Sequence, residues 1–321
     1  MNRIAALPTV DIMPFSEIRE KRTALLVTSA PAWKAVRGEL RLTVGARVEP
    51  RQATTAHWDS LISGRASSAF EVVYAVGSGL AADAAKYLAL SLALPLVVLP
   101  TALSVDAFLT SVSGIRRDGC VYYVASHVPE RLVLDLDILA GAPSSVRAAG
   151  IVDVLSVATG CWDWKFAEAR GKNPPGMGFR PWGYDNAHSI LTGALDCAEA
   201  AGQADKDGLR ALFDCLCMEV QLCNQLGHAR PEEGSEHYFA YSVENLVGHG
   251  RPHADLVGPG ISIMARLQGQ DATLLEKALG ACHIPLDRIA PDILKETLRG
   301  LPKYCVRHNL PYGLAHELEA E

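Results

Sequence analysis

The stretch from Val72 to Ser91 joins an apolar, β-branched run to a run of helix-forming residues through the tripeptide Gly-Ser-Gly, and it reads VVYAVGSGLAADAAKYLALS. Glycine lets a backbone turn tightly between a strand and a helix. The helix that follows begins with free N–H groups and a partial positive charge, which together form a natural seat for a phosphate. This junction predicts an α/β fold with an anion-binding turn at the head of a helix.

The hexapeptide Gly77-Ser78-Gly79-Leu80-Ala81-Ala82 matches the dinucleotide-binding pattern G-x-G-x-x-G/A. Two features differ from an ordinary Rossmann site. The motif follows the third predicted strand rather than the first, and the residues from Ala84 to Val105 include no acid that could bind a ribose. Taken alone, the motif fits either a dinucleotide site or a plain strand-to-helix turn.

The first half of the chain alternates between short β-branched runs and helical patterns. Strands are predicted at 23–29, 41–48, 71–76 and 94–101, and helices at 54–63 and 83–93. Such alternation implies parallel strands with crossover helices. After Pro143 the strand signals fade and apolar residues recur at helical spacing. We therefore predict an α/β N-terminal domain with a Rossmann-like parallel sheet (residues 1–140), followed by an all-α C-terminal domain (residues 141–321).

Charge and hydropathy limit the classes of molecule that this chain is expected to bind. The chain of 321 residues has a formal net charge of −6 and no basic run, which disfavours nucleic-acid and membrane-surface binding. The longest apolar stretch, Tyr87 to Leu99, is interrupted by Pro95 and is too short to span a bilayer. The first residues carry prolines and acids where a signal peptide has an apolar centre. We expect a cytoplasmic homo-oligomer that acts on a small molecule.

Three segments of the second half carry residues that suit a metal ion. Asp153 lies inside an apolar helical stretch, where a carboxylate needs a partner. His237 lies in the first turn of a predicted helix with Tyr241 one turn later, and His253 and His249 lie at the head of another helical run. One carboxylate and two imidazoles suit a divalent ion such as zinc with one position open for substrate. Spacing alone does not show that these segments converge, and capping or packing also explains each residue.

Five motifs in the same order resemble the sn-glycerol-1-phosphate dehydrogenase family, within the wider group of iron-type alcohol dehydrogenases and dehydroquinate synthases. The matching strings are VGSGLAADAAKYLA, LPTALSVDAFLTS, DLDILAGAPSSVRAAGIVD, GSEHYFAY and HADLVGPG. In that family the glycine loop follows a later strand, as it does here. The resemblance implies NAD or NADP at the glycine loop and one divalent metal, zinc or alternatively iron or nickel.

The resemblance also implies roles for individual residues. Asp153, His237 and His253 would be the metal ligands, with His249 as the alternative to His253. Asp106 would hydrogen-bond a substrate hydroxyl. Tyr241 stands where the family usually has a second histidine, and it could donate a hydrogen bond at the site. The cofactor would contact Gly77, Ser78, Gly79, Leu80, Ala81, Thr101, Ser104 and Thr110.

The activity that the resemblance implies is the metal-dependent, NAD(P)-linked interconversion of a secondary alcohol and a ketone on a small polyol phosphate. Glycerol 1-phosphate is the typical alcohol and dihydroxyacetone phosphate the typical ketone of this reaction. Arg251 is the first candidate for the phosphate, and Arg116, Arg117 and Arg230 are others, although a solvated loop position also explains each of them.

Departures from the family pattern keep other functions open. Besides Tyr241, the chain has Ala254 and Asp255 where relatives carry glycine and glutamate. One alternative is a sugar-phosphate cyclase of the dehydroquinate synthase type, which uses NAD only transiently. Another is a non-catalytic homologue that kept the fold.

Overall fold

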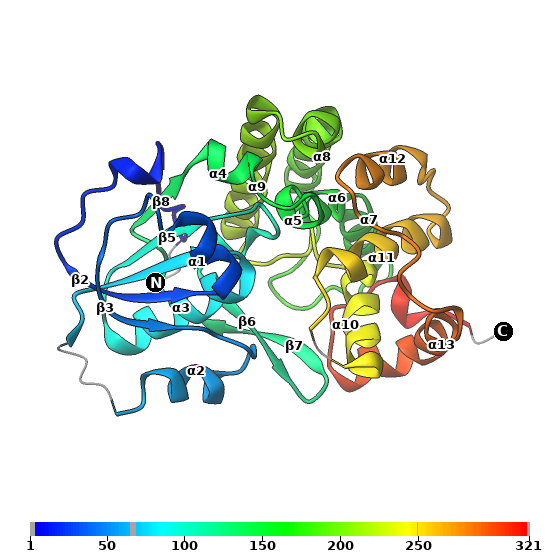
Figure 1. Cartoon of the computed structure of the whole chain (residues 1–321). Helices are drawn as coiled ribbons and strands as arrows, with labels where there is room; N and C mark the ends of the chain where they lie inside the picture. The colour runs from blue at the N-terminus through cyan, green and yellow to red at the C-terminus, as the bar shows by residue number, and fades with distance from the viewer. Residues whose placement is uncertain (1–3, 65–68, 249, 320–321) are drawn as a thin grey trace. The chain divides into compact units, whose positions relative to one another are not determined.

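The computed structural model describes residues 4–64, 69–248 and 250–319 (Figure 1). The chain divides into two compact units. The α/β unit comprises Ala5–Arg117 and Val121–Arg147, and the helical unit comprises Met1–Ile4, Asp118–Cys120 and Ala148–Glu321. His249, the alternative metal ligand, lies outside the described residues. Within the described ranges, no helix combines the length and the hydropathy that a membrane span requires.

In the described part of the α/β unit, six strands form one parallel sheet in the order β1-β8-β5-β4-β2-β3. Strand β4 lies between β5 and β2, and all of its residues are buried. A strand covered on both faces needs a continuous apolar run, which VVYAVG supplies. The predicted Rossmann-like sheet is therefore confirmed. The strands are β1 (Thr9–Ile12), β2 (Thr23–Thr28), β3 (Thr43–Val48), β4 (Val72–Gly77), β5 (Leu96–Pro100) and β8 (Arg131–Leu134).

Strand β1 is missing from the sequence prediction. Its residues pair in parallel with β8, from Thr9 with Arg131 to Ile12 with Leu134. None of the four residues of β1 is buried, so the strand lacks the apolar pattern that marks β2, β4 and β5. Pairing with a strand distant in the sequence makes this segment extended. The glycine loop consequently follows the fourth strand of the chain.

Helices of the α/β unit connect or flank the strands, and a β-hairpin follows β5. The buried Lys86 of α3 lies 3.1 Å from Asp83 Oδ1, and its Nζ donates to Thr110 Oγ1 at 2.8 Å and to the carbonyl oxygen of Val112. These bonds anchor α3 to the segment after β5, which bears several predicted site residues. The elements are α1 (Ala30–Val36), α2 (Thr55–Ile62), α3 (Gly79–Leu92), β6 (Val112–Arg117), β7 (Cys120–Ala125), α4 (Leu136–Ala140) and α5 (Ser144–Arg147).

From residue 148 onward, the described residues form helices and no strand, as predicted for the second half. Helices α8 and α9 make an antiparallel pair whose tight turn is capped by Asp205, which accepts from the Gly208 N–H at 2.8 Å. Figure 1 shows these helices in green. The helices are α6 (Ile151–Leu155), α7 (Val157–Ala169), α8 (Pro181–Gly202), α9 (Lys206–Leu226), α10 (Ser235–Val247), α11 (Ala254–Leu267), α12 (Thr273–Ala281) and α13 (Pro291–Arg307).

Candidate metal centre and glycine loop

The glycine loop lies at the carboxyl end of β4 and needs both of its glycines. Gly77 has φ +144°, and a Cβ added there would lie 3.2 Å from Ala81 Cβ. A Cβ added to Gly79 would lie 2.8 Å from Val105 Cγ1, a distance shorter than Cβ atoms show to their neighbours in real proteins. The Thr101 N–H donates to the Gly77 carbonyl oxygen at 3.1 Å, so the segment after β5 lies beside the loop.

Helix α3 begins at this loop with the free N–H groups of its first turn. Ser78 is the N-cap residue, and its side chain makes no capping hydrogen bond, so the helix does not use its hydroxyl. The turn is therefore able to bind an anion through backbone N–H groups and the helix dipole. A parallel sheet commonly binds ligands at the carboxyl ends of its strands.

The other residues predicted to contact the cofactor, together with Asp106, lie in the α/β unit with the loop. Ser104 and Asp106 are half-buried, and Asp106 opens a short 3-10 helix, Asp106–Phe108. The Thr110 hydroxyl accepts a hydrogen bond from Lys86 Nζ. It donates one to the Val112 carbonyl oxygen at 3.0 Å. Its hydrogen bonds thus already serve to anchor α3. Leu80 is partly exposed and Ala81 is buried.

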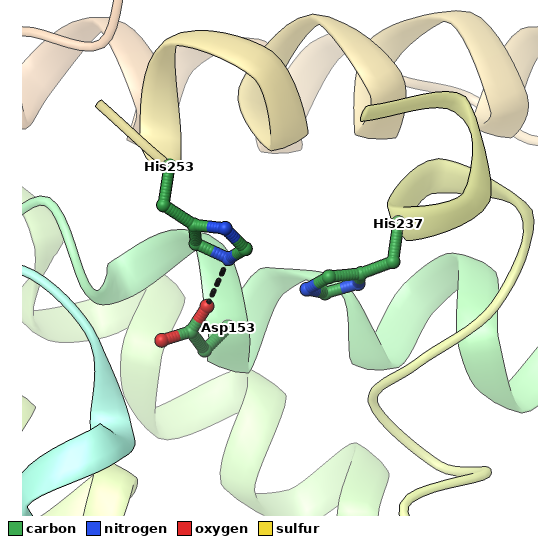
Figure 2. A group of neighbouring side chains, drawn as sticks. All are labelled: Asp153, His237 and His253. Carbon is green, nitrogen blue, oxygen red and sulfur yellow. Dashed lines mark hydrogen bonds and ion pairs between the residues drawn. The ribbon is translucent and has the colours of Figure 1, made fainter. Parts of the chain in front are cut away.

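The three predicted metal ligands converge in the helical unit. Asp153 comes from α6, His237 from the first turn of α10, and His253 is the N-cap residue of α11. Each offers a ligand atom within 4.8 Å of those of the other two. Figure 2 shows Asp153 and His253 joined by a hydrogen bond, with 3.1 Å between Oδ1 and Nε2, and His237 beside them. The two imidazole ring centroids are 5.3 Å apart.

Close packing of α10 against α11 brings the two histidines together. A Cβ added to Gly260 of α11 would lie 2.6 Å from the carbonyl oxygen of Glu236 in α10, so only glycine permits this approach of the two backbones. Gly160 of α7 is similarly close to the segment before α10, with 2.8 Å between an added Cβ and the Pro231 carbonyl oxygen. The glycines therefore set the distances between the segments that carry the site.

The imidazole of His237 is oriented by Glu236, which is fully buried. Glu236 Oε1 lies 3.0 Å from His237 Nδ1, which leaves Nε2 to face the triad. Burial acts to lower the pKa of His237, but the hydrogen bond and charge of Glu236, with the charges of Glu233 and Asp153, outweigh it and raise this pKa. The site is thus electronegative, as a cation site requires.

The N-terminus of α10 is held by the C-terminal segment of the chain. The buried carboxylate of Asp163 accepts from the Ser235 N–H at 2.7 Å and from the Leu314 N–H at 2.8 Å. Ser235 Oγ in turn accepts from the Ala315 N–H at 2.8 Å. Burial and the charge of Glu236 raise the pKa of Asp163 to about 6. His237, two residues after Ser235, is therefore placed by contacts distant in the sequence.

Tyr241 and Arg230 are buried and hydrogen-bonded, whereas Arg251 is exposed. Tyr241 is 4% exposed, and its hydroxyl donates to Glu233 Oε1 at 2.8 Å. Arg230 is not a solvated loop residue: it is 2% exposed, and its guanidinium donates to the Tyr312 carbonyl oxygen at 2.7 Å. Arg251 is exposed and donates to the Arg288 carbonyl oxygen at 3.1 Å.

The donor set of the triad fits a divalent metal. It combines one carboxylate oxygen with two imidazole nitrogens, two of the three residues are buried, and three protein ligands leave a position for a substrate atom. A second group in the described residues, Glu219, Cys223 and Glu232, also has ligand atoms within 4.8 Å of one another. Two carboxylates and a thiol lack the imidazoles that typify catalytic zinc sites, so the triad is the better candidate.

Two acids beside the triad were not anticipated from the sequence. Glu236 orients His237, and Glu233 accepts the Tyr241 hydroxyl. The string EEGSEH contains the only available signal, because acids close to a ligating histidine commonly hold its second ring nitrogen. Which acid turns toward the imidazole depends on the turn before α10, and the residue pattern does not specify that turn.

Known proteins resemble this chain in both sequence and fold. The family model of iron-containing alcohol dehydrogenase matches residues 12–143. The glycerol-1-phosphate dehydrogenase [NAD(P)+] of Sulfurisphaera tokodaii is 30% identical over 219 residues, covering 68% of this chain and 61% of the relative. The enzyme of the same name from Bacillus subtilis is 31% identical over 183 residues, covering 57% of this chain and 45% of the relative. The chain thus spans less than two thirds of the length of either relative.

The fold is shared over nearly the whole chain with a solved structure. A probable glycerol dehydrogenase from Sinorhizobium meliloti superimposes with a TM-score of 0.72 at 19% identity, covering 98% of this chain and 93% of that protein. Residues 12–143 match the iron-containing alcohol dehydrogenase family, and the chain is similar over 68% of its length to a glycerol-1-phosphate dehydrogenase.

Proposed function

We propose that the protein is a metal-dependent, NAD(P)-linked oxidoreductase that interconverts a secondary alcohol and a ketone on a small polyol phosphate, such as glycerol 1-phosphate. The observation that carries this proposal is the convergence of Asp153, His237 and His253, whose ligand atoms lie within 4.8 Å of one another. The glycine loop supports the cofactor class. The names of the Sulfurisphaera tokodaii and Bacillus subtilis relatives support the substrate class.

Asp153, His237 and His253 would hold the metal, and we propose zinc. One carboxylate and two imidazoles are common ligands of a catalytic zinc ion. Iron(II) and nickel(II) accept the same donor atoms, so metal supply contributes to the choice. The dinucleotide phosphates would bind at the N-terminus of α3, and we propose contacts from the loop residues and from Thr101, Ser104 and Thr110.

A divalent ion held there would supply Lewis-acid stabilisation of negative charge on the alcohol oxygen, and a nicotinamide cofactor would supply the hydride chemistry. Asp153 contributes a negative charge that retains the cation. Glu236 holds the Nδ1 proton of His237, so that Nε2 keeps its lone pair for ligation. We propose that Asp106 accepts a hydrogen bond from a substrate hydroxyl and thereby orients the substrate.

Elemental analysis of the purified protein tests the metal centre. We expect about one divalent ion per chain in the wild type and none in Asp153→Ala, because the two remaining histidines have lost their carboxylate partner. Asp214→Ala, which removes an exposed carboxylate of α9, is the control and should retain the ion. A wild-type protein without metal after zinc reconstitution would contradict the proposed metal centre.

Turnover with polyol phosphates tests the reaction class. We expect steady oxidation of NADH or NADPH with dihydroxyacetone phosphate as the ketone. A cyclase of the dehydroquinate synthase type would produce no net change of the cofactor, and a non-catalytic homologue would show no turnover. Arg251→Gln should raise KM for dihydroxyacetone phosphate more than for dihydroxyacetone if its guanidinium binds the phosphate.

A further inference from the structure

We infer that Glu233 is a positioning residue of the candidate metal centre. By accepting the hydroxyl proton of Tyr241, it holds the tyrosine ring beside His237 and so restricts the imidazole that would bind the ion. The inference rests on the proposed function, because it concerns the same metal triad. It gives the hydroxyl of Tyr241 a structural partner, where the family resemblance implied that this hydroxyl could donate a hydrogen bond at the site.

The geometry of α10 places the two rings side by side. Tyr241 follows His237 by four residues, which is one helical turn, so both side chains lie on the same face. Their ring centroids are 6.0 Å apart with an angle of 59° between the planes. His253 lies near the same imidazole, at 5.3 Å between ring centroids. The imidazole of His237 therefore has the imidazole of His253 and the ring of Tyr241 as neighbours.

Glu233 fixes the far end of the tyrosine. The residue precedes α10, and its Oε1 accepts from the Tyr241 hydroxyl at 2.8 Å, a bond between positions eight residues apart. Hydrogen bonds to a carboxylate are stronger than those between neutral groups. Because Tyr241 is 4% exposed, loss of this acceptor would leave a nearly buried hydroxyl without its carboxylate partner. We expect the ring to shift in response.

Two acids thus act on His237 in different ways. Glu236 holds Nδ1 at 3.0 Å and thereby sets which nitrogen faces the triad. Through its hydrogen bond to Tyr241, Glu233 limits rotation of the His237 imidazole about the bonds that join it to the backbone. Groups that hold metal ligands in this way typically change metal affinity by about 10- to 100-fold when removed. The inference therefore predicts an effect on metal binding without any direct contact between Glu233 and the ion.

A double-mutant cycle on zinc affinity, measured by competition with a chromophoric chelator, tests the inference. We expect Glu233→Ala and Tyr241→Phe each to weaken zinc binding about 10-fold, and the double variant to be no weaker than the single variants, because all three lose the same bond. Glu233→Gln retains an amide oxygen as acceptor and should stay within about 3-fold of the wild type. Tyr184→Phe, which removes a hydroxyl from α8, is the control and should leave the affinity unchanged.

Additive losses in the double variant, or single variants with wild-type affinity, would overturn the inference and leave the proposed function standing. A wild-type protein that binds no zinc would overturn both. Thermal unfolding of each variant without metal shows whether a loss of affinity reflects a general loss of folding. A loss of zinc affinity in Glu233→Ala that Glu233→Gln does not restore would also count against positioning through the hydrogen bond.

Discussion

The glycine loop and the metal triad are built in different ways. The loop consists of consecutive residues between β4 and α3, and its shape follows from two glycines and a helix N-terminus. The triad takes one residue from each of α6, α10 and α11, and the first and last of them are 100 positions apart. Local backbone geometry makes the first site, whereas packing of distant helices makes the second.

This difference has a consequence for how mutations act. A contiguous site should respond mainly to changes within its own few residues. A convergent site should respond also to changes that move a helix, even where no ligand is touched. A change in one region, with measurements at both sites, tests this contrast.

Removal of a metal ligand should have the largest effect and should leave the loop intact. We expect Asp153→Ala to reduce turnover by more than about 100-fold, because even groups that only support metal ligands are worth about 10- to 100-fold. Dinucleotide affinity, measured by fluorescence titration of NADH and NADPH, should remain within about 2-fold of the wild type. A parallel loss of dinucleotide binding would break the contrast between the two sites.

Displacement of a helix should disturb the triad from a distance. We expect Gly260→Ala to cost roughly 1–3 kcal/mol of unfolding free energy, as overpacking does, because the added Cβ meets the Glu236 backbone. Zinc affinity should fall by about 10-fold, since α10 and α11 can no longer approach closely. The matched control is Gly280→Ala in α12, where an added Cβ meets nothing within 4 Å. Equal zinc affinity in both variants would show that helix packing does not control the site.

A change in the glycine loop should weaken dinucleotide binding and leave the metal triad intact. Because Gly77 has φ +144°, we expect Gly77→Ala to cost roughly 1–3 kcal/mol in backbone strain. The reshaped turn should weaken dinucleotide binding, while the zinc content of the protein stays at the wild-type level. Calorimetric unfolding and elemental analysis of the same preparation measure both effects. A loss of zinc in this variant would mean that the two sites are not independent.

The smallest effect is expected from pH, through His228 in the segment that leads to His237. Burial and the charges of Arg230 and Arg180 lower the pKa of His228 to about 4, below the usual value of about 6.5. A lowered pKa in the folded state means that stability is present above pH 6.5 and is lost as pH falls toward 4.

Because His228 is partly exposed, we expect the loss to be on the order of 1 kcal/mol. His228→Asn retains an acceptor for the Arg230 N–H and should flatten the acid side of the stability profile. Urea unfolding of both proteins between pH 4.5 and 7 measures this slope. Parallel profiles would contradict a role for His228.

Much of the α/β fold was predictable because strands β2, β4 and β5 are buried along almost their whole length. Strands β2, β4 and β5 have apolar runs that match their burial, and these runs were identified. Strand β1 was missed because its residues are not buried and its strand character depends on pairing with β8. The helical second half was recognised from periodic apolar residues, a signal that is strong wherever one face of a helix is buried.

The order of residues along the chain by itself determined the strand–glycine–helix junction, because Gly77 and Gly79 act through their own backbone and that of their neighbours. It also supplied a carboxylate and two imidazoles of the right chemical types. Only the tertiary structure decided that Asp153, His237 and His253 meet, that Glu236 and Glu233 turn toward the site, and that Arg230 is buried. The physical reason is that these placements depend on distances between helices, which are set by close backbone contacts such as that of Gly260 with Glu236.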